Sequence, residues 1–223
     1  MARPKIYDDR LAHRLIADAA QVLAVGGVEA LSLRPLAAGA GTSTSAVYAM
    51  FKDKAGLVAA VVDRARDGFL QAQRASPSTG DLPADLRALG HAYRDWALAN
   101  PSMYAVMFGG RARPGRCEAA EGAEPAPDDG RSAGSHVTAE LMDDETIAVL
   151  AGLVQAMLAA GLLQGDLTTI TLSIWAAVHG MVSLEITGAW PLRGIAARTL
   201  YDEHLAAIAR AWQSQAATGS ASD

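Results

Sequence analysis

The sequence predicts an all-α protein of about nine helices. Apolar residues recur along most of it at spacings of three and four, the period of a helix with one buried face. The alternation of apolar and polar residues that indicates a half-buried strand is not found. Glycine, proline and capping residues divide the chain into segments of helical length.

The composition is that of a globular protein with a sizeable core. The chain has 223 residues, of which 51% are hydrophobic and 19% charged, so wholesale disorder is excluded. A single cysteine, Cys117, excludes an intramolecular disulfide and a four-cysteine zinc site, and a reducing cytoplasm is the expected location. The longest apolar stretch, 147–163, is short for a bilayer, so we expect no membrane partner.

Charge is distributed unevenly along the chain. Residues 1–66 carry nine basic and six acidic side chains, whereas residues 67–223 carry ten basic and eighteen acidic ones. A basic N-terminal module can approach phosphate groups while an acidic body serves another purpose.

The first two helices are bounded by glycine, serine and proline. Apolar stripes through residues 15–23 predict a first helix that stops at Gly26-Gly27. Ser32 is suited to cap the second helix, with Pro35 in the first turn, where a missing N–H costs little. This helix is short because residues 39–41 read Gly-Ala-Gly.

The next two helices begin at capping side chains. Ser43 is suited to cap a third helix that runs to Phe51. Asp53 is suited to start the fourth, because its carboxylate favours the positive end of the helix dipole. The fourth helix carries a stripe of apolar residues that faces a core, namely Val58, Val62, Ala65 and Phe69.

Five further helices are expected, at 82–100, 102–108, 143–163, 168–188 and 194–215. Between them, residues 109–142 are rich in Gly, Ala, Pro and charge, and we expect a mobile loop there. We expect two domains, at 1–57 and 58–216, followed by a disordered tail at 217–223.

Residues 31–51 fit a helix-turn-helix. Ala37 is small enough to let two helices cross closely, and Gly41 can take the positive φ of a tight turn. Thr44, Ser45 and Ala46, at the start of the second helix, are short enough to let it approach base edges in the major groove.

Phosphate-binding groups surround this motif. They are the first amides of the helix capped by Ser43, the Tyr48 hydroxyl and Lys54. Arg3 and Lys5 form a basic arm that either reaches the DNA or is simply solvated.

The segment 31–57 resembles the DNA-binding domain of the tetracycline-repressor (TetR) family of bacterial transcriptional regulators. The resemblance rests on Tyr48-x-x-Phe51-x-x-Lys54-x-x-Leu57, preceded by Ala40-Gly41-Thr42-Ser43. It implies phosphate contacts from Thr42, Ser43, Tyr48 and Lys54, and base contacts from Thr44, Ser45 and Ala46. Ser32, at the start of the preceding helix, completes the candidate DNA-binding residues.

The C-terminal part resembles one branch of this family, named for a Trp-His-Gly (WHG) signature. The signature is Trp175-Ala-Ala-Val-His179-Gly180, and 98–108 matches the same branch. The resemblance implies a homodimer through the last two helices. Helix 168–188 independently needs two packing partners because two of its stripes are apolar.

A pocket for a small-molecule ligand is expected among flexible methionines and aromatic residues. The alternative is that the same residues are ordinary core, and that His179 is a hydrogen-bonded core histidine. The eight candidates are Trp96, Met103, Tyr104, Met107, Phe108, Met157, Trp175 and His179.

Catalysis is not expected. Gly39-Ala40-Gly41 is not followed by a P-loop lysine, the five histidines lack metal-ligand spacing, and no Gly-x-Ser-x-Gly occurs. We therefore predict no catalytic residue, metal or cofactor.

The sequence leaves two interpretations of function. The first is a cytoplasmic, homodimeric regulator, a repressor that binds a palindromic double-stranded DNA operator and is released by a small molecule. The second is a helical ligand-binding protein with weak or no specific operator binding, because Ala49-Met50 offers no phosphate donor beside Phe51.

Overall fold

A computed structural model describes residues 9–109, 145–189 and 194–213 of the chain. These ranges contain helices and a single isolated bridge, between Leu163 and Gln213, so the all-α prediction is confirmed. Three expected features lie outside the described residues: the basic arm with Arg3 and Lys5, the loop beyond Gly109, and the tail.

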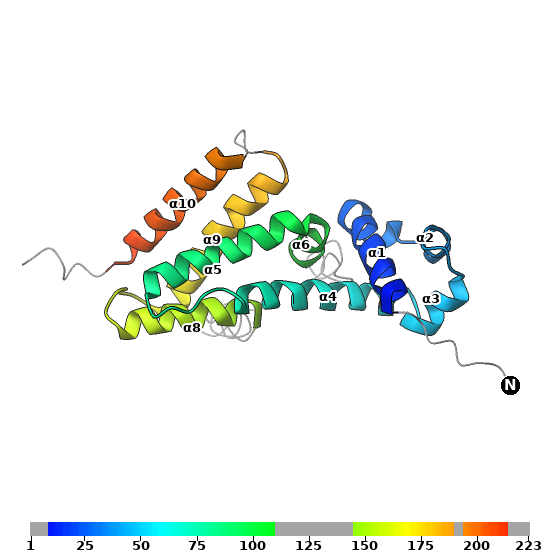
Figure 1. Cartoon of the computed structure of the whole chain (residues 1–223), viewed down its shortest axis with the longest axis horizontal. Helices are drawn as coiled ribbons and strands as arrows, with labels where there is room; N and C mark the ends of the chain where they lie inside the picture. Colours follow the sequence, from blue (N-terminus) through cyan, green and yellow to red (C-terminus); the bar gives the residue numbers. More distant parts are fainter. Residues whose placement is uncertain (1–8, 110–144, 190–193, 214–223) are drawn as a thin grey trace, which may run out of the picture. The chain divides into compact units, whose positions relative to one another are not determined.

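Nine helices are described, and Figure 1 shows their order along the chain. They are α1 (Asp9–Ala30), α2 (Leu33–Gly39), α3 (Thr44–Phe51), α4 (Lys54–Arg74), α5 (Leu82–Ala99), α6 (Pro101–Phe108), α8 (Glu145–Ala159), α9 (Leu167–Ile186) and α10 (Gly194–Ala211).

The chain divides into two compact units. The first comprises Met1–Gly68 and Asn100–Pro127, and the second comprises Phe69–Ala99 and Asp128–Asp223. This division differs from the expected boundary after residue 57. The physical reasons are that α4 continues without a break to Arg74 and that α6, which we expected in the second domain, packs against α1.

The core of the first unit joins α1, α2, α3, α6 and the first part of α4. Its fully buried side chains include Leu15, Leu23, Val47, Leu57 and Val61. Helix α1 is assigned through Ala30, but Gly27 takes the non-helical angles φ 68° and ψ −169°, so two helical segments meet there at a kink. The first segment therefore ends at the glycine pair, as expected.

The turn between α2 and α3 has the expected construction. Gly41 takes φ 66°, and Ala37 is buried where α2 packs on α3. The Ser43 hydroxyl accepts a hydrogen bond from the Ala46 N–H at 3.2 Å, which confirms the predicted cap of α3.

Ser32 occupies the cap position of α2, but its side chain makes no capping hydrogen bond. An N-cap side chain accepts from the second or third N–H of the helix. The third residue of α2 is Pro35, which has no N–H, so the proline removes one of the two available donors. The predicted capping role of Ser32 is therefore wrong.

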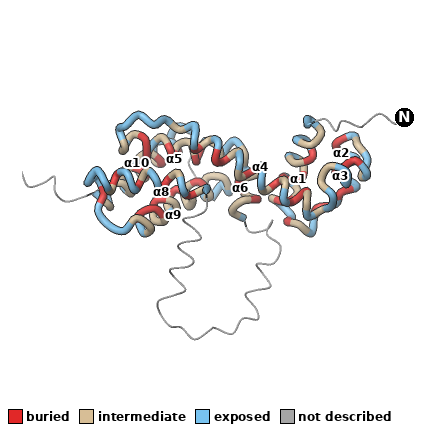
Figure 2. The backbone as a smooth tube through the Cα atoms, turned by 90° about the horizontal axis from the view of Figure 1, so that it is seen from below, coloured by how far each residue is buried: buried red, intermediate tan, exposed pale blue. Residues whose placement is uncertain are grey.

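In the second unit, α5 is the shared element, because α8, α9 and α10 all pack against it. The buried residues of this group appear as red stretches of the tube along α5, α8 and α9 in Figure 2. Helix α8 ends at Ala159 instead of residue 163, because Gly161 turns the backbone at φ 70°. Helix α9 begins one residue before the expected position, capped by the Asp166 carboxylate.

The two cap serines provide a matched test of this local structure. Ser43→Ala should lower the free energy of unfolding by about 1 kcal/mol, because it leaves the Ala46 N–H without its acceptor. Ser32→Ala should change it by much less, because Ser32 makes no such bond. Urea unfolding at one protein concentration measures both. Equal losses would contradict the described caps.

Candidate nucleic-acid interface and ligand cavity

Helix α3 presents one exposed face. Ser45, Tyr48, Ala49 and Lys52 are all exposed, and they follow the spacing that places residues on one side of a helix. Tyr48 has 53% of its surface exposed, a high value for a large aromatic side chain. The opposite side, with Val47, is buried in the core of the first unit. Helix α3 is therefore anchored by one face and free along the other.

Ala46 does not lie on that exposed face. Only 7% of its surface is exposed, because it follows Ser45 by one residue and points toward the interior beside Val47. The expected base contact from Ala46 therefore needs correction, and Ala49 is the small residue that α3 exposes. The spacing of three and four from Ser45 could have identified Ala49 from the sequence.

The expected phosphate-binding side chains lie around α3. Ser43 is exposed at its start, Thr42 is half-buried in the turn before it, and Lys54 is half-buried at the first residue of α4. The Asp53 carboxylate accepts the Gly56 N–H at 2.7 Å and so serves as a cap of α4. This bond keeps the Asp53 carboxylate, the one acidic group between Lys52 and Lys54, at the start of α4.

Lys52 is a residue that sequence reasoning missed. It ends α3 with φ 69°, and across it the Asp53 N–H donates to the Phe51 carbonyl at 2.8 Å. This tight turn places an exposed lysine directly at the end of the exposed face of α3. A positive φ is rare for a residue with a side chain and marks a constrained position.

The second unit contains a cavity of about 320 Å³ among α5, α8, α9 and α10. Its walls are mainly apolar, with Leu86, Leu150, Ile174 and Leu205 among them. The volume is within the range of small-molecule sites. The cavity lies wholly in the second unit.

The eight expected ligand residues are not brought together around this cavity. Trp175 lines it, Met157 is buried elsewhere in the second unit, and Trp96 packs edge-on against Phe69 at 5.2 Å. Four further residues of the set lie on α6 in the first unit, namely Met103, Tyr104, Met107 and Phe108. Met103 packs there against the core of the first unit.

His179 lies behind the cavity wall. Its Nδ1 is 2.9 Å from the hydroxyl oxygen of Tyr93, which lines the cavity, and its ring stacks on Trp175 with centroids 5.3 Å apart. Burial lowers the pKa of His179, so its imidazole is neutral at pH 7. These contacts fit a hydrogen-bonded core histidine that supports two lining residues.

A buried ion pair, also missed by sequence reasoning, fixes α5 to α9. Arg94 has 5% of its surface exposed and donates two hydrogen bonds to the Glu185 carboxylate, at 2.8 and 2.6 Å. These bonds raise the pKa of Arg94 above its ordinary value. The guanidinium also lies over the ring of Tyr201 on α10, 5.6 Å from its centroid. The sequence did hold a signal for this pair, because Arg94 is a charged residue within the stripe of α5 that is otherwise mostly apolar and buried.

Metal-binding and membrane-spanning features have little support. Within the described ranges, no group of three His, Cys, Asp or Glu side chains is placed to hold a metal ion. Helices α1 and α9 are long and apolar enough to cross a membrane, a criterion that core helices of soluble proteins also meet. Both have buried faces in their own units.

The Arg94–Glu185 pair should be costly to break on one side. Arg94→Met leaves a buried carboxylate without its partner and should lower the free energy of unfolding by about 3–5 kcal/mol. The double variant Arg94→Met, Glu185→Met should recover most of the loss. Arg198→Met, which removes an exposed 3.8 Å pair with Asp95, should cost at most about 1 kcal/mol. A double variant as unstable as the single one, in urea unfolding at fixed concentration, would contradict the description.

Sequence comparisons identify two family domains in the chain. Residues 15–61 match the model described as bacterial regulatory proteins, tetR family. Residues 86–208, more than half of the chain, match the model described as the tetracyclin repressor-like C-terminal domain. No curated protein sequence is significantly similar to the chain.

Solved structures share the fold over nearly the full length. A protein of unknown function from Rhodococcus sp. RHA1 is 26% identical, with a TM-score of 0.61, and the match covers 95% of this chain and 100% of that one. The TetR family regulator PfmR from Thermus thermophilus is 18% identical, with a TM-score of 0.64 and coverages of 88% and 97%. A tetR family regulatory protein from Rhodococcus RHA1 is 20% identical, with a TM-score of 0.63 and coverages of 92% and 97%.

Two matched family domains in the expected order therefore agree with the helix-turn-helix geometry of α2 and α3. The chain belongs to the TetR family of bacterial regulatory proteins and is a non-enzymatic, DNA-binding regulator of transcription.

Proposed function

We propose that the protein is a cytoplasmic repressor that binds a palindromic operator as a homodimer and leaves it when a small molecule enters the second unit. The observation that supports this most is the exposed face of α3. A helix with a buried inner side and small polar residues outside is suited to a major groove.

Each group around α3 has a distinct part in the proposed DNA complex. Thr44 and Ser45 read base edges, with Ala49 allowing close approach. Phosphates are bound by the groups that surround the helix and fix its orientation: Ser32, Thr42, Ser43, Tyr48, Lys52 and Lys54. Met50 packs against the core of the first unit, so these groups supply the contacts that it does not.

Dimerisation is proposed through α9 and α10. A Cβ added at Gly180, in the middle of α9, would meet nothing within 4 Å in its own chain. Glycine in a helix interior costs about 1 kcal/mol relative to alanine, and the close approach of a partner's helix offsets such a cost. Ala176 and Leu184, which is 49% exposed, lie on the same face. A partner's helix that approaches closely at Gly180 would explain the glycine, the small Ala176 and the exposed Leu184 on this face.

The second unit is proposed to be a ligand-binding domain of the Trp-His-Gly subtype. Trp175 and Tyr93 line the cavity, His179 supports both, and Gly180 faces the partner. The signature thus combines a cavity wall and a dimer surface within two turns of one helix. Ligand binding releases DNA only if the ligand has unequal affinities for the two subunit arrangements.

DNA binding should respond differently to two hydroxyl removals. Tyr48→Phe should weaken binding to every duplex by about tenfold, because it removes a hydrogen bond to a charged phosphate. Ser45→Ala should instead change the preferred sequence, because its hydroxyl faces bases. Fluorescence anisotropy on an operator selected from random duplexes, at two salt concentrations, measures both effects.

The control is Ser78→Ala, an exposed serine of the second unit, which should leave DNA binding unchanged. If Tyr48→Phe and Ser45→Ala behave like this control, α3 is not the recognition helix. Weak, salt-independent binding of the unmodified protein would favour the alternative of a ligand-binding protein without an operator.

The dimer interface has a matched glycine test. Gly180→Ala should weaken dimerisation by about tenfold or more, because the new methyl group separates the two α9 helices. Gly152→Ala, on α8, also adds a methyl group in open space and improves helix propensity, but should leave dimerisation unchanged. Sedimentation equilibrium of the full chain gives both dissociation constants. Equal values for the two variants would place the interface elsewhere.

A further inference from the structure

The cavity of the second unit has a charge opposite to that of the protein around it. The whole chain has a formal net charge of −5. Among the described residues, however, the lining of the cavity includes Arg87 and Arg210 and no Asp or Glu. The remaining lining is apolar or uncharged.

The two arginines lie at the same end of the cavity. Helices α5 and α10 run antiparallel, because Gly90 packs against Leu205 while Asp95, further along α5, pairs with Arg198 near the start of α10. Residues before Gly90 on α5 therefore lie beside residues after Leu205 on α10. Arg87 and Arg210 are such residues, so their charges add at one end of the cavity.

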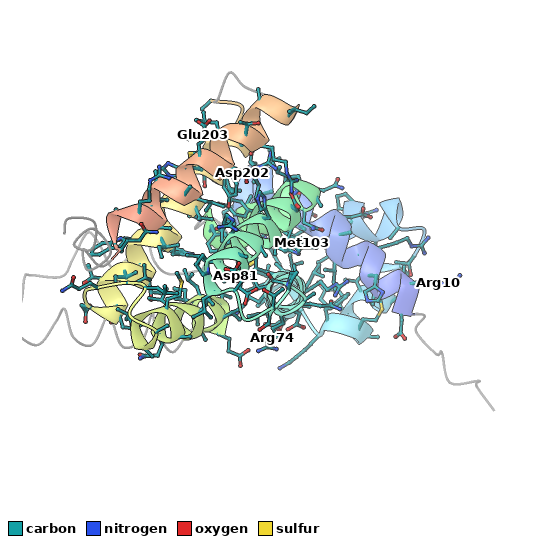
Figure 3. All side chains as sticks on the ribbon, turned by 60° about the vertical axis from the view of Figure 1, so that its left-hand side comes forward. Arg10, Arg74, Asp81, Met103, Asp202 and Glu203 are labelled. Atoms are coloured by element: carbon teal, nitrogen blue, oxygen red, sulfur yellow. The ribbon has the colours of Figure 1, made fainter. Side chains whose placement is uncertain are left out.

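Nearby acidic groups have other partners. Asp81 caps the Ala84 N–H at 3.0 Å, and Asp85 accepts hydrogen bonds from Thr79 and Gly80. Asp202, labelled on α10 in Figure 3, pairs with His91 at 2.6 Å. Within the described part of the chain, neither cavity arginine has an acidic partner.

Helix stabilisation accounts for only one of the two arginines. Arg210 is in the last turn of α10, where a cation is favoured by the helix dipole. Arg87 is in the N-terminal half of α5, where the dipole offers a cation no stabilisation. A guanidinium that is exposed, faces an apolar cavity and serves no local purpose is suited to bind an anion from outside.

We infer that this cavity takes an apolar ligand with a single anionic group, which Arg87 and Arg210 bind at one end while the body lies among the apolar walls. The volume of 320 Å³ is at the lower end of the range of small-molecule sites, which favours a ligand of modest size. The inference rests on the proposed function in taking this cavity as the ligand site.

The test compares two probes with the same body and different head groups. Decanoate and 1-decanol, both below the concentrations at which they aggregate, are titrated into the full chain by calorimetry without DNA. Decanoate should bind about tenfold or more tightly than decanol, a difference of about 1.4 kcal/mol. The double variant Arg87→Gln, Arg210→Gln should lose this preference and keep its affinity for decanol.

Arg64→Gln is the matched control, because Arg64 is an exposed arginine of α4 in the first unit and does not line the cavity. It should keep the decanoate preference, and circular dichroism verifies that every variant is folded. Equal binding of the two probes, or a preference that survives in the double variant, would overturn the inference.

Operator binding, measured on the same preparations, separates this inference from the proposed function. If neither probe binds while the operator does, the ligand class is wrong and the regulator remains. If decanoate binds through the arginines while no operator is bound, the ligand class is supported and the proposed repressor function fails.

Discussion

The buried pair of Arg94 and Glu185 is the constraint on which the second unit depends. A buried guanidinium and carboxylate tolerate little displacement, because either charge without its partner is strongly destabilising. The pair therefore fixes the register of α5 against α9. Helix α10 is held against α5 at the same place. The Tyr201 hydroxyl donates to the Gly90 carbonyl of α5 at 2.7 Å, and the Tyr201 ring lies under the Arg94 guanidinium. The cavity and the open face at Gly180 lie on helices aligned in this way.

In the proposed function, helix α4 is the element that links the ligand cavity to DNA binding. It starts three residues after α3 ends, and its last residues belong to the second unit. There Phe69 packs edge-on against Tyr93, with ring centroids 5.1 Å apart, and Tyr93 is part of the cavity wall. A ligand that moves Tyr93 must also move Phe69 or lose this contact. Because a packed aromatic pair has few alternative arrangements, such a displacement favours a discrete shift over gradual deformation.

Local signals in the sequence predicted local structure well. Gly41, Ser43 and Asp53 each act through neighbours within a few residues, so the turn and the helix starts followed from their chemistry. Ser32 failed for an equally local reason, since Pro35 removes one of its two donors. The packing of α6 on α1 and the pairing of Arg94 with Glu185 were not predicted, because they join residues about 90 apart in the chain, a separation that periodicity does not report. The cavity also joins distant parts of the chain, because it is built mainly from aliphatic residues of four helices. The residues expected from the sequence were instead chosen by type, as aromatic and methionine side chains.

We propose that two copies of α3 read two half-sites of one operator. Hydroxyl-radical footprinting of the full-length protein on a duplex selected from random sequences tests it most directly. Two symmetric protected patches are expected, related by a palindrome and centred one helical turn, about 34–36 Å, or a multiple of it apart. A single patch, or protection without symmetry at saturating protein, would contradict a dimer that presents α3 to the DNA twice.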